Sequence, residues 1–160
     1  MTMKRIVSVV LLAIALTSGE VAAQQAPAAQ PHAVETFFLA GIKAFNAHEL
    51  DTFMAQFAGD IEMYTPTGWL RGSQAVRERF TQTFQQFPKV KMEVENLRVR
   101  EVTQGTVVTD FNWRVYPMGA GPAFHGVGSG VYVMRNGRWM EVLEHETVVK
   151  VDEGLGPPKR

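Results

Sequence analysis

Residues 123–151 read AFHGVGSGVYVMRNGRWMEVLEHETVVKV, and this segment gives the clearest indication of the fold. Its apolar residues largely alternate with polar or small ones, which is the period-two pattern of β-strands. In the middle, Asn136-Gly137 supplies the pair of residues that a tight hairpin turn favours, because both must adopt positive φ. We therefore predict two long strands, at about 123–135 and 138–151, joined as an antiparallel hairpin.

Two further β-segments precede this hairpin, at about 90–103 and 106–117. Turn signals separate all four segments, so the strands should form an antiparallel meander. Within the first segment, the apolar residues change from even to odd positions between Val94 and Leu97. A one-residue change of phase predicts a β-bulge, and bulges bend sheets. We therefore expect a strongly curved sheet.

The first half of the chain shows helical spacing instead. Apolar residues recur every three or four positions at 34–45, from about 49 to 57, and at 73–87, where Pro88 ends the pattern. A short strand, 61–65, is predicted between the second and third helices. Three helices followed by a sheet with one apolar face must bury that face together, which predicts an α+β fold with the helices packed on the antiparallel sheet.

The N-terminus has the three parts of a secretory signal. Lys4 and Arg5 precede an apolar run at 6–16, and Val21-Ala22-Ala23 offers small residues for a peptidase. The apolar run is too short for a bilayer-spanning helix, although an uncleaved anchor is the alternative. We expect 1–23 to be the signal peptide, 24–31 a flexible tether, 32–153 the domain and 154–160 a flexible tail. The protein would then be secreted or periplasmic.

Composition excludes several classes of partner. The chain carries 16 basic and 16 acidic residues, which gives no electrostatic reason to bind nucleic acid or an anionic membrane. It has no cysteine, so neither disulfides nor a thiol-linked lipid anchor can form. The four histidines lack HxH or HxxxH spacing, and no nucleotide-binding motif occurs. We therefore expect no metal, no cofactor and no membrane anchor after signal cleavage.

Several local segments carry a family resemblance. They are Phe57-Ala58-Gly59-Asp60, Gly72-Ser73, and Asn136-Gly137-Arg138-Trp139 leading into Glu144-His145-Glu146-Thr147. With the order α-α-β-α-β-β-β-β, they resemble the SnoaL-like (DUF4440-type) branch of the NTF2-like superfamily. The ending is similar to the family's "DG-W … HEH-S" pattern, but Leu143 replaces the first His and Thr147 the Ser. The resemblance implies a cone with one pocket between sheet and helices, and a homodimer formed through the sheet. Family members include isomerases, cyclases, dehydratases and non-catalytic binders.

The final strand gives the leading site candidates. Its even positions carry Glu144, Glu146 and Lys150 and should face solvent or a partner, so its odd positions should face inward. This prediction places His145 in the pocket, with Glu141 and Thr147 on the same face. A pocket histidine can act as a general base or a hydrogen-bond donor. The alternative is a core histidine that a neighbouring carbonyl or hydroxyl satisfies.

Other candidates lie on the remaining strands and loops. In the second long strand, Phe111, Trp113 and Val115 should face inward, although the opposite assignment would put Asp110 and Asn112 in the pocket. We also expect Trp69, in the loop before the third helix, to cover the pocket. His125 should lie at the rim of the pocket. The ligand-binding candidates are Tyr64, Trp69, Trp113, His125, Ser129, Glu141, His145 and Thr147.

Three functional hypotheses follow. The first is a protein that binds a small apolar or amphipathic molecule in the cone without strong catalysis. The second is an isomerase- or cyclase-type enzyme with His145 as general base, although the first helix carries Phe37 and Phe38 where the resemblance implies an isomerase tyrosine. The third is a homodimeric interaction module whose pocket its own side chains fill.

Overall fold

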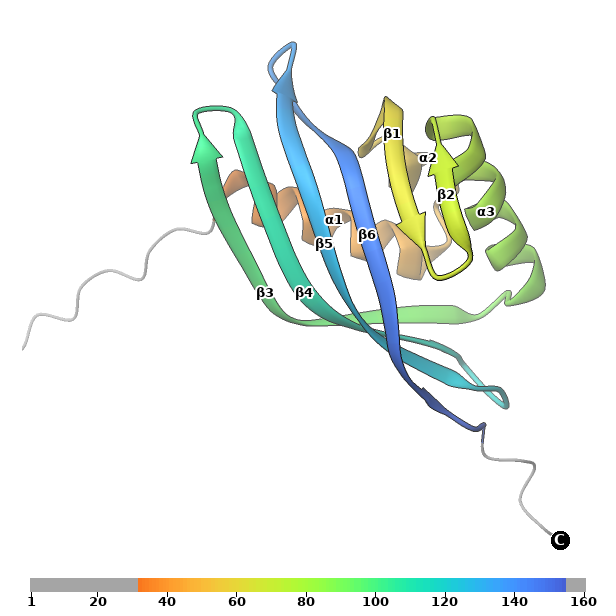
Figure 1. The fold of residues 1–160 in the computed structure, drawn as a ribbon. Coiled ribbons are helices and arrows are strands. Elements are labelled where there is room, and N and C mark those ends of the chain that lie inside the picture. Colours follow the sequence, from red (N-terminus) through yellow and green to blue (C-terminus); the bar gives the residue numbers. More distant parts are fainter. Residues whose placement is uncertain (1–31, 155–160) are drawn as a thin grey trace, which may run out of the picture.

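The computed structural model describes residues 32–154, so the expected signal peptide, the tether and almost all of the tail lie outside the described residues. Figure 1 shows a curved sheet with helices on one of its faces. The elements in chain order are α1 (Ala33–Ala47), α2 (Leu50–Met54), β1 (Phe57–Thr65), β2 (Gly68–Arg71), α3 (Ser73–Gln86), β3 (Val90–Thr103), β4 (Thr106–Pro117), β5 (Ala123–Arg135) and β6 (Arg138–Asp152).

The six strands form one sheet in the order β2-β1-β6-β5-β4-β3. The four long strands pair antiparallel as predicted, and their bounds match the sequence pattern to within a residue. One pairing was not predicted, since β1 lies beside β6 and runs parallel to it. The sequence also missed β2, which pairs antiparallel with β1 across a two-residue turn. The predicted α+β fold, with helices packed on a curved sheet, is confirmed.

Bulges in the long strands bend the sheet. The predicted bulge in β3 is present, because the register with β4 shifts between Glu95 and Arg98, and Asn96 adopts a positive φ of 54°. A second bulge was not predicted. In β6, Glu141 lies opposite Tyr132 and Leu143 lies opposite Val131, which leaves Val142 as an extra residue. An extra residue reverses the side-chain alternation after it.

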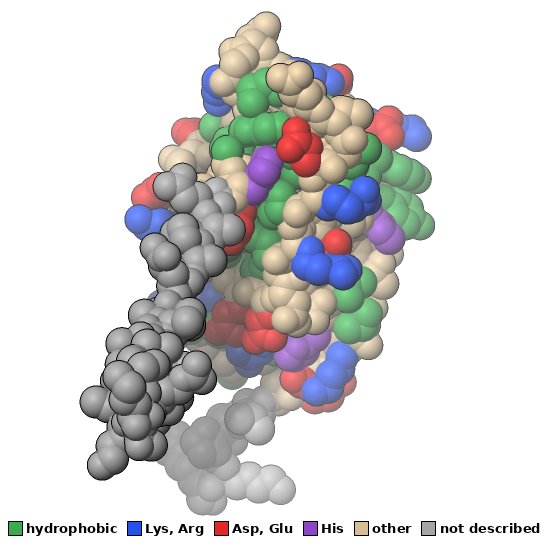
Figure 2. Space-filling view, turned by 90° about the vertical axis from the view of Figure 1, so that its left-hand side faces the viewer, with side chains coloured by type: hydrophobic (Ala, Val, Ile, Leu, Met, Phe, Trp, Pro, Cys, Tyr) green, Lys and Arg blue, Asp and Glu red, His purple; other side chains and the backbone are tan. Residues whose placement is uncertain are grey.

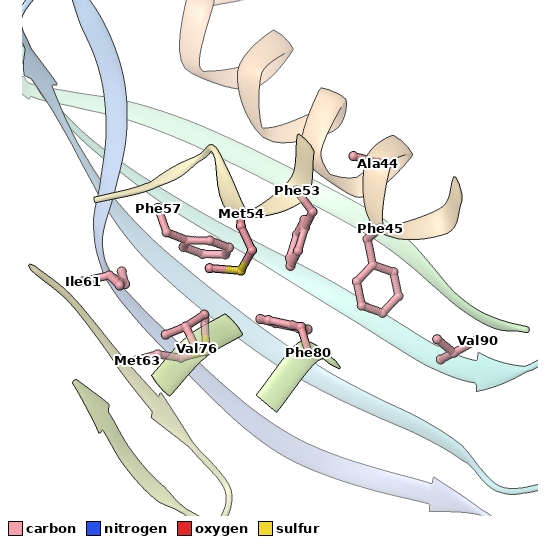
Figure 3. Packing of buried hydrophobic residues seen from close by; sticks show 10 residues of the cluster. All are labelled: Ala44, Phe45, Phe53, Met54, Phe57, Ile61, Met63, Val76, Phe80 and Val90. Carbon is pink, nitrogen blue, oxygen red and sulfur yellow. The ribbon is translucent and has the colours of Figure 1, made fainter. Parts of the chain in front are cut away.

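Four phenylalanines pack together within the core between the helices and the sheet (Figure 3). Phe53 of α2 lies at the centre, with ring centroids 5.5 Å from Phe45, 5.2 Å from Phe57 and 4.7 Å from Phe80. The ring planes meet nearly at right angles, the edge-to-face arrangement that aromatic pairs prefer. Phe80 brings α3 into this cluster, so the cluster joins all three helices to the sheet.

The corner between α1 and α2 is fixed to β3. The Asn46 side chain donates to the carbonyl of Met92 at 2.8 Å and accepts from the amide of Met92 at 2.7 Å. His48 ends α1 with a left-handed φ of 59°, and its ring stacks on Phe84 of α3. These contacts hold the end of α1 over the concave face of the sheet, where the site described below lies.

Figure 2 views the molecule from the side of β3, where basic and acidic side chains are mixed rather than segregated by sign. Ion pairs join neighbouring strands of the sheet, such as Arg98–Asp110 at 2.6 Å and Arg114–Glu93 at 3.2 Å. No helix within residues 32–154 is both long enough and apolar enough to span a membrane.

Candidate functional site

A cavity of about 250 Å³ lies between the helices and the concave face of the sheet. Phe45 of α1 and Phe80 of α3 form one wall, and Trp113, Phe124 and Val148 form the opposite wall. Three prolines from two different turns, Pro66, Pro117 and Pro122, also line it. Most of the lining is apolar, and an apolar cavity of about 150 Å³ is already enough to bind benzene.

A second, narrower cavity of about 30 Å³ adjoins the first. Four side chains line both spaces, namely those of Phe80, Met92, Trp113 and Glu146. The narrow end is more polar than the wide part, because Gln56, Glu141 and Glu144 also line it. The site is therefore a wide apolar chamber with a small polar inner end.

The bulge at Val142 accounts for this polar end. Before the bulge, Glu141 faces inward as predicted and is only 4% exposed. After it, Glu144 and Glu146 line the cavity although the sequence predicted that they face outward. That prediction assumed regular alternation along β6, and the extra residue invalidates it. Three carboxyl groups of one strand are thus brought into the cone.

One of these acids has a charged partner. Arg79 of α3 donates to Glu146 at 2.6 Å, and its other terminal nitrogen lies 2.9 Å from the sulfur of Met63. The Glu146 side chain is 10% exposed and that of Arg79 is 29% exposed. Such a partly buried, charge-assisted pair is stronger than a surface ion pair. It links α3 to β6 across the cavity wall.

The other two acids have raised pKa values. The pKa of Glu144 is raised to about 8, first by burial and second by the Glu146 carboxylate, against a lowering effect of Arg79. Burial likewise raises the pKa of Glu141 well above its usual range, with Glu144 as the next cause. A buried carboxyl group takes up a proton to avoid carrying a charge in a medium of low polarity. At neutral pH the inner end therefore holds protonated acids.

Three glycines of β5 make room for the side chains of this site. A Cβ at Gly126 would lie 2.1 Å from the Trp113 ring, and one at Gly128 would lie 2.5 Å from the Phe111 ring. At Gly130 it would lie 2.4 Å from Oε1 of Glu141. The space left by the three missing Cβ atoms is therefore filled by the protein's own aromatic rings and by the side chain of one acid.

Three buried polar atoms have no hydrogen-bond partner within the described part of the chain. They are Oγ1 of Thr109, Nε1 of Trp113 and the hydroxyl oxygen of Tyr132. Tyr132 is completely buried, and burial raises the pKa of its hydroxyl, with Glu141 as the next cause. Unpaired buried polar groups are costly and mark places where a ligand or water can bind.

The structure places His145 outside the cavity, so its predicted inward orientation is wrong. The side chain is exposed on the convex face of the sheet. Its ring lies 5.3 Å from that of Tyr64, which in turn lies 4.9 Å from that of Trp69. Thr147 completes the group, since its hydroxyl lies 3.2 Å from Nε2 of His145. The reason is again the bulge at Val142.

The remaining candidates divide between the two faces. Ser129 lies opposite His145 in the sheet and belongs to the convex face. His125 shares a hydrogen bond of 2.8 Å with Asp152 and lies near the start of β5. Trp69 lies in β2 and not in a loop, and it is 50% exposed. Of the eight candidates, only Trp113 and Glu141 line the cavity, and the inward face predicted for Trp113 is confirmed.

The polar residues of the site that the sequence did not predict include Gln56, Arg79, Glu144 and Glu146. The adjacent apolar residues Val142 and Leu143 break the alternation along this strand, as the phase change in β3 does. This break indicated a bulge, and a bulge turns the two glutamates that follow inward. Arg79 gave no comparable signal within an otherwise polar helix face. No group of three or more His, Asp and Glu residues between 32 and 154 has the geometry to hold a metal ion.

The comparisons with known proteins agree with this architecture. The profile of the SnoaL-like domain matches residues 38–142. No curated protein matches the chain. A solved structure of an uncharacterised protein with a cystatin-like fold from Caulobacter vibrioides is similar, with a TM-score of 0.65 at 18% identity, covering 74% of this chain and 88% of that one.

Two other solved structures show the same fold. An NTF2-like protein of Pseudomonas putida KT2440 has a TM-score of 0.65 at 14% identity, covering 71% of this chain and 82% of that one. A hexachlorocyclohexane dehydrochlorinase, LinA type 2, has a TM-score of 0.65 at 14% identity, covering 79% and 92%. Because the family profile spans most of the described domain, this chain belongs to the SnoaL-like domain family and has the NTF2-like fold.

Proposed function

We propose that this protein binds a small, largely apolar molecule in the cone, with a polar group of that molecule at the inner end. The observation that carries the proposal is the cavity itself, which is about 250 Å³ in volume and lined mainly by aromatic and aliphatic side chains. Ligand sites are concave and mostly apolar, with a few polar groups that fix orientation. Arg79, Glu144 and Glu146 have the position of such orienting groups.

A blocking variant tests this proposal. Thr83 of α3 lines the chamber, whereas its neighbour Gln82 is exposed on the same helix. Thr83→Trp should fill the chamber, and Gln82→Trp should leave it open. A thermal-shift screen of single-ring compounds should then find ligands that stabilise the wild type and Gln82→Trp but not Thr83→Trp. Equal stabilisation of both variants would place the binding elsewhere and contradict the proposal.

A second candidate is a proton-transfer enzyme, and the pair of neighbouring acids favours it. Glu146 is paired with Arg79 at 2.6 Å, while Glu144 has a pKa raised to about 8. Two acids whose environments separate their protonation states can act as base and acid in one reaction. One neighbour in fold is named a dehydrochlorinase, a type of reaction that needs proton removal. In this candidate Glu146 replaces His145 as the base.

Turnover separates the two candidates. Under the enzyme candidate, a compound that binds in the cavity is also converted, and Glu146→Gln removes at least 99% of the conversion because the base is gone. General acid–base groups typically contribute about 10²- to 10⁴-fold to a rate. If bound compounds are recovered unchanged after prolonged incubation, the protein is a binder under those conditions and the first proposal stands alone.

We also propose that the convex face forms a homodimer. Tyr64, Trp69, Val127 and Val149 are each more than 40% exposed and lie on strands whose opposite face carries the core. A two-fold interface needs a self-complementary patch, and this face combines apolar side chains with mixed charges. Light scattering on the purified protein should give twice the chain mass. Val127→Asp should give the mass of one chain, and a monomeric wild type would refute the proposal.

A further inference from the structure

The inner end of the cavity contains more acidic groups than basic ones. Glu141, Glu144 and Glu146 line it, and Arg79 is the one basic side chain lining either cavity within residues 32–154. Arg79 is already engaged by Glu146 at 2.6 Å. The site therefore holds two carboxyl groups, Glu141 and Glu144, with no basic side chain of their own.

Glu141 has neutral groups beside it. A Cβ built at Gly130 would lie 2.4 Å from Oε1 of Glu141, 3.1 Å from Oγ1 of Thr109 and 3.0 Å from the Tyr132 ring, so these groups converge on one point. Both hydroxyls are buried without another partner within the described chain and can donate to this carboxyl group. The hydroxyls of Thr109 and Tyr132 are thus the hydrogen-bond donors available to Glu141.

Glu144 is left as the acid without a partner. Its side chain forms no hydrogen bond with any residue that the structure describes, and it lines the narrow end. The charged and titratable groups around it are Glu141 and Glu146 on β6, Tyr132 on β5 and Arg79 on α3. A ligand that carries its own positive charge and hydrogen-bond donors would satisfy this carboxylate, because the protein does not.

The size of the inner end fits such a group. Its volume of about 30 Å³ exceeds the roughly 10–15 Å³ that a cavity needs to hold one water molecule. An ammonium group, like water, has one heavy atom, so it fits this space. The Trp113 ring lines both spaces and would flank the cation, where ring faces attract positive charge, while the Phe80 ring already lies 5.0 Å from the Arg79 guanidinium.

We propose that the cavity selects small amines, with the ammonium group on Glu144 in the inner end and the apolar body in the chamber. This inference rests on the proposed binding function and adds the chemical class of the ligand. Binding of the cation ionises Glu144, so amine binding at neutral pH releases a proton to the solvent.

A matched set of three compounds tests the charge selection: 2-phenylethylamine, 2-phenylethanol and phenylacetate. They share a ring and differ in the polar end. At pH 9 the amine should bind at least tenfold more tightly than the alcohol, and phenylacetate should bind most weakly. An aliphatic amine stays largely protonated there, since such groups titrate near about 10.4 in lysine. Equal affinities, or tighter binding of phenylacetate, would overturn the inference.

The pH dependence gives a second readout that needs no variant. With the pKa of Glu144 at about 8, the ionised fraction rises from pH 6.5 to pH 9 enough to increase amine affinity about 30-fold, with no such increase for the alcohol. Calorimetry at pH 7 in two buffers of different ionisation heat should show release of about one proton per amine bound. Amine binding without proton release would contradict the role of Glu144.

Glu144→Gln should bring amine affinity down to that of the alcohol and remove the pH dependence, while Glu95→Gln, at an exposed acid of β3, should leave both unchanged. The outcomes separate the two proposals. If all three compounds bind equally and Thr83→Trp blocks them, the cavity binds ligands and only the charge selection is wrong. If no compound in the screen or in this set binds, the binding function fails as well.

Discussion

Glu144 should make the free energy of unfolding of this protein depend on pH. The pKa of this carboxyl group is 4.5 in an unfolded chain and about 8 in the folded protein. Because the folded state holds the proton more tightly, this group favours folding at low pH. Its contribution declines as the pH rises above 4.5 and is lost once the pH passes 8.

Linkage gives the size of the effect. Between pH 5.5 and pH 8.5, this one group lowers the free energy of unfolding by about 3 kcal/mol. That figure is an upper limit, since Glu144 as a residue is only partly buried and water screens part of the cost. Glu144→Gln keeps the shape and removes the titration. The stability of the variant relative to the wild type should therefore rise by up to about 3 kcal/mol between pH 5.5 and pH 8.5.

Urea unfolding at pH 5.5, 7 and 8.5 measures this directly, with Glu95→Gln as the matched exposed control. Some pH dependence should remain in Glu144→Gln, because the pKa of Glu141 is raised by the same burial. If the wild type and Glu144→Gln give parallel curves across this range, Glu144 does not titrate abnormally. The raised pKa assigned to Glu144 would then be refuted.

Three further predictions concern the fold and its processing. Gly126→Ala should destabilise the protein by about 1–3 kcal/mol, since the new Cβ meets the Trp113 ring, while Gly59→Ala, which meets nothing within 4 Å, should be nearly neutral in the same urea unfolding assay. Asn46→Ala should cost about 1–3 kcal/mol in that assay by leaving the Met92 amide and carbonyl unpaired, and a loss below 0.5 kcal/mol would show that water replaces the side chain. Intact-mass analysis of the protein produced in its own host should give the mass of residues 24–160, and retention of residues 1–23 would favour the uncleaved anchor.

Most of the fold could be predicted because period and turn chemistry are local signals. The four long strands and the helix over 73–87 follow from residue spacing alone, and the phase change near Val94 correctly predicted a bulge. The parallel pairing of β1 with β6 could not be predicted, since contacts between strands far apart in sequence leave no local pattern. The short strand β2 was missed for a related reason, because its four residues are too few to show alternation.

The site was predicted less well than the fold. The inward face of β4 was assigned correctly, so Trp113 was placed, but the face of β6 was reversed beyond Val142. Because the extra residue was not recognised, His145 was predicted to face the cavity, whereas Glu144 and Glu146 line it. The approach of Arg79 to Glu146 depends on how α3 lies over the sheet, which is a tertiary property. The sequence correctly indicated that β6 carries residues of the site. The direction of the side chains on that strand was predicted wrongly.

The extra residue in β6 also affects how this chain should be aligned with its relatives. Two strands with the same inner side chains can differ by one residue in length, if one of them has the bulge at Val142 and the other does not. An alignment that puts the gap a few positions away would match Glu144 with an outward-facing position of the relative. Functional residues of this family should therefore be matched by counting from the bulge in each structure, and sequence position alone would equate groups on opposite faces of the sheet.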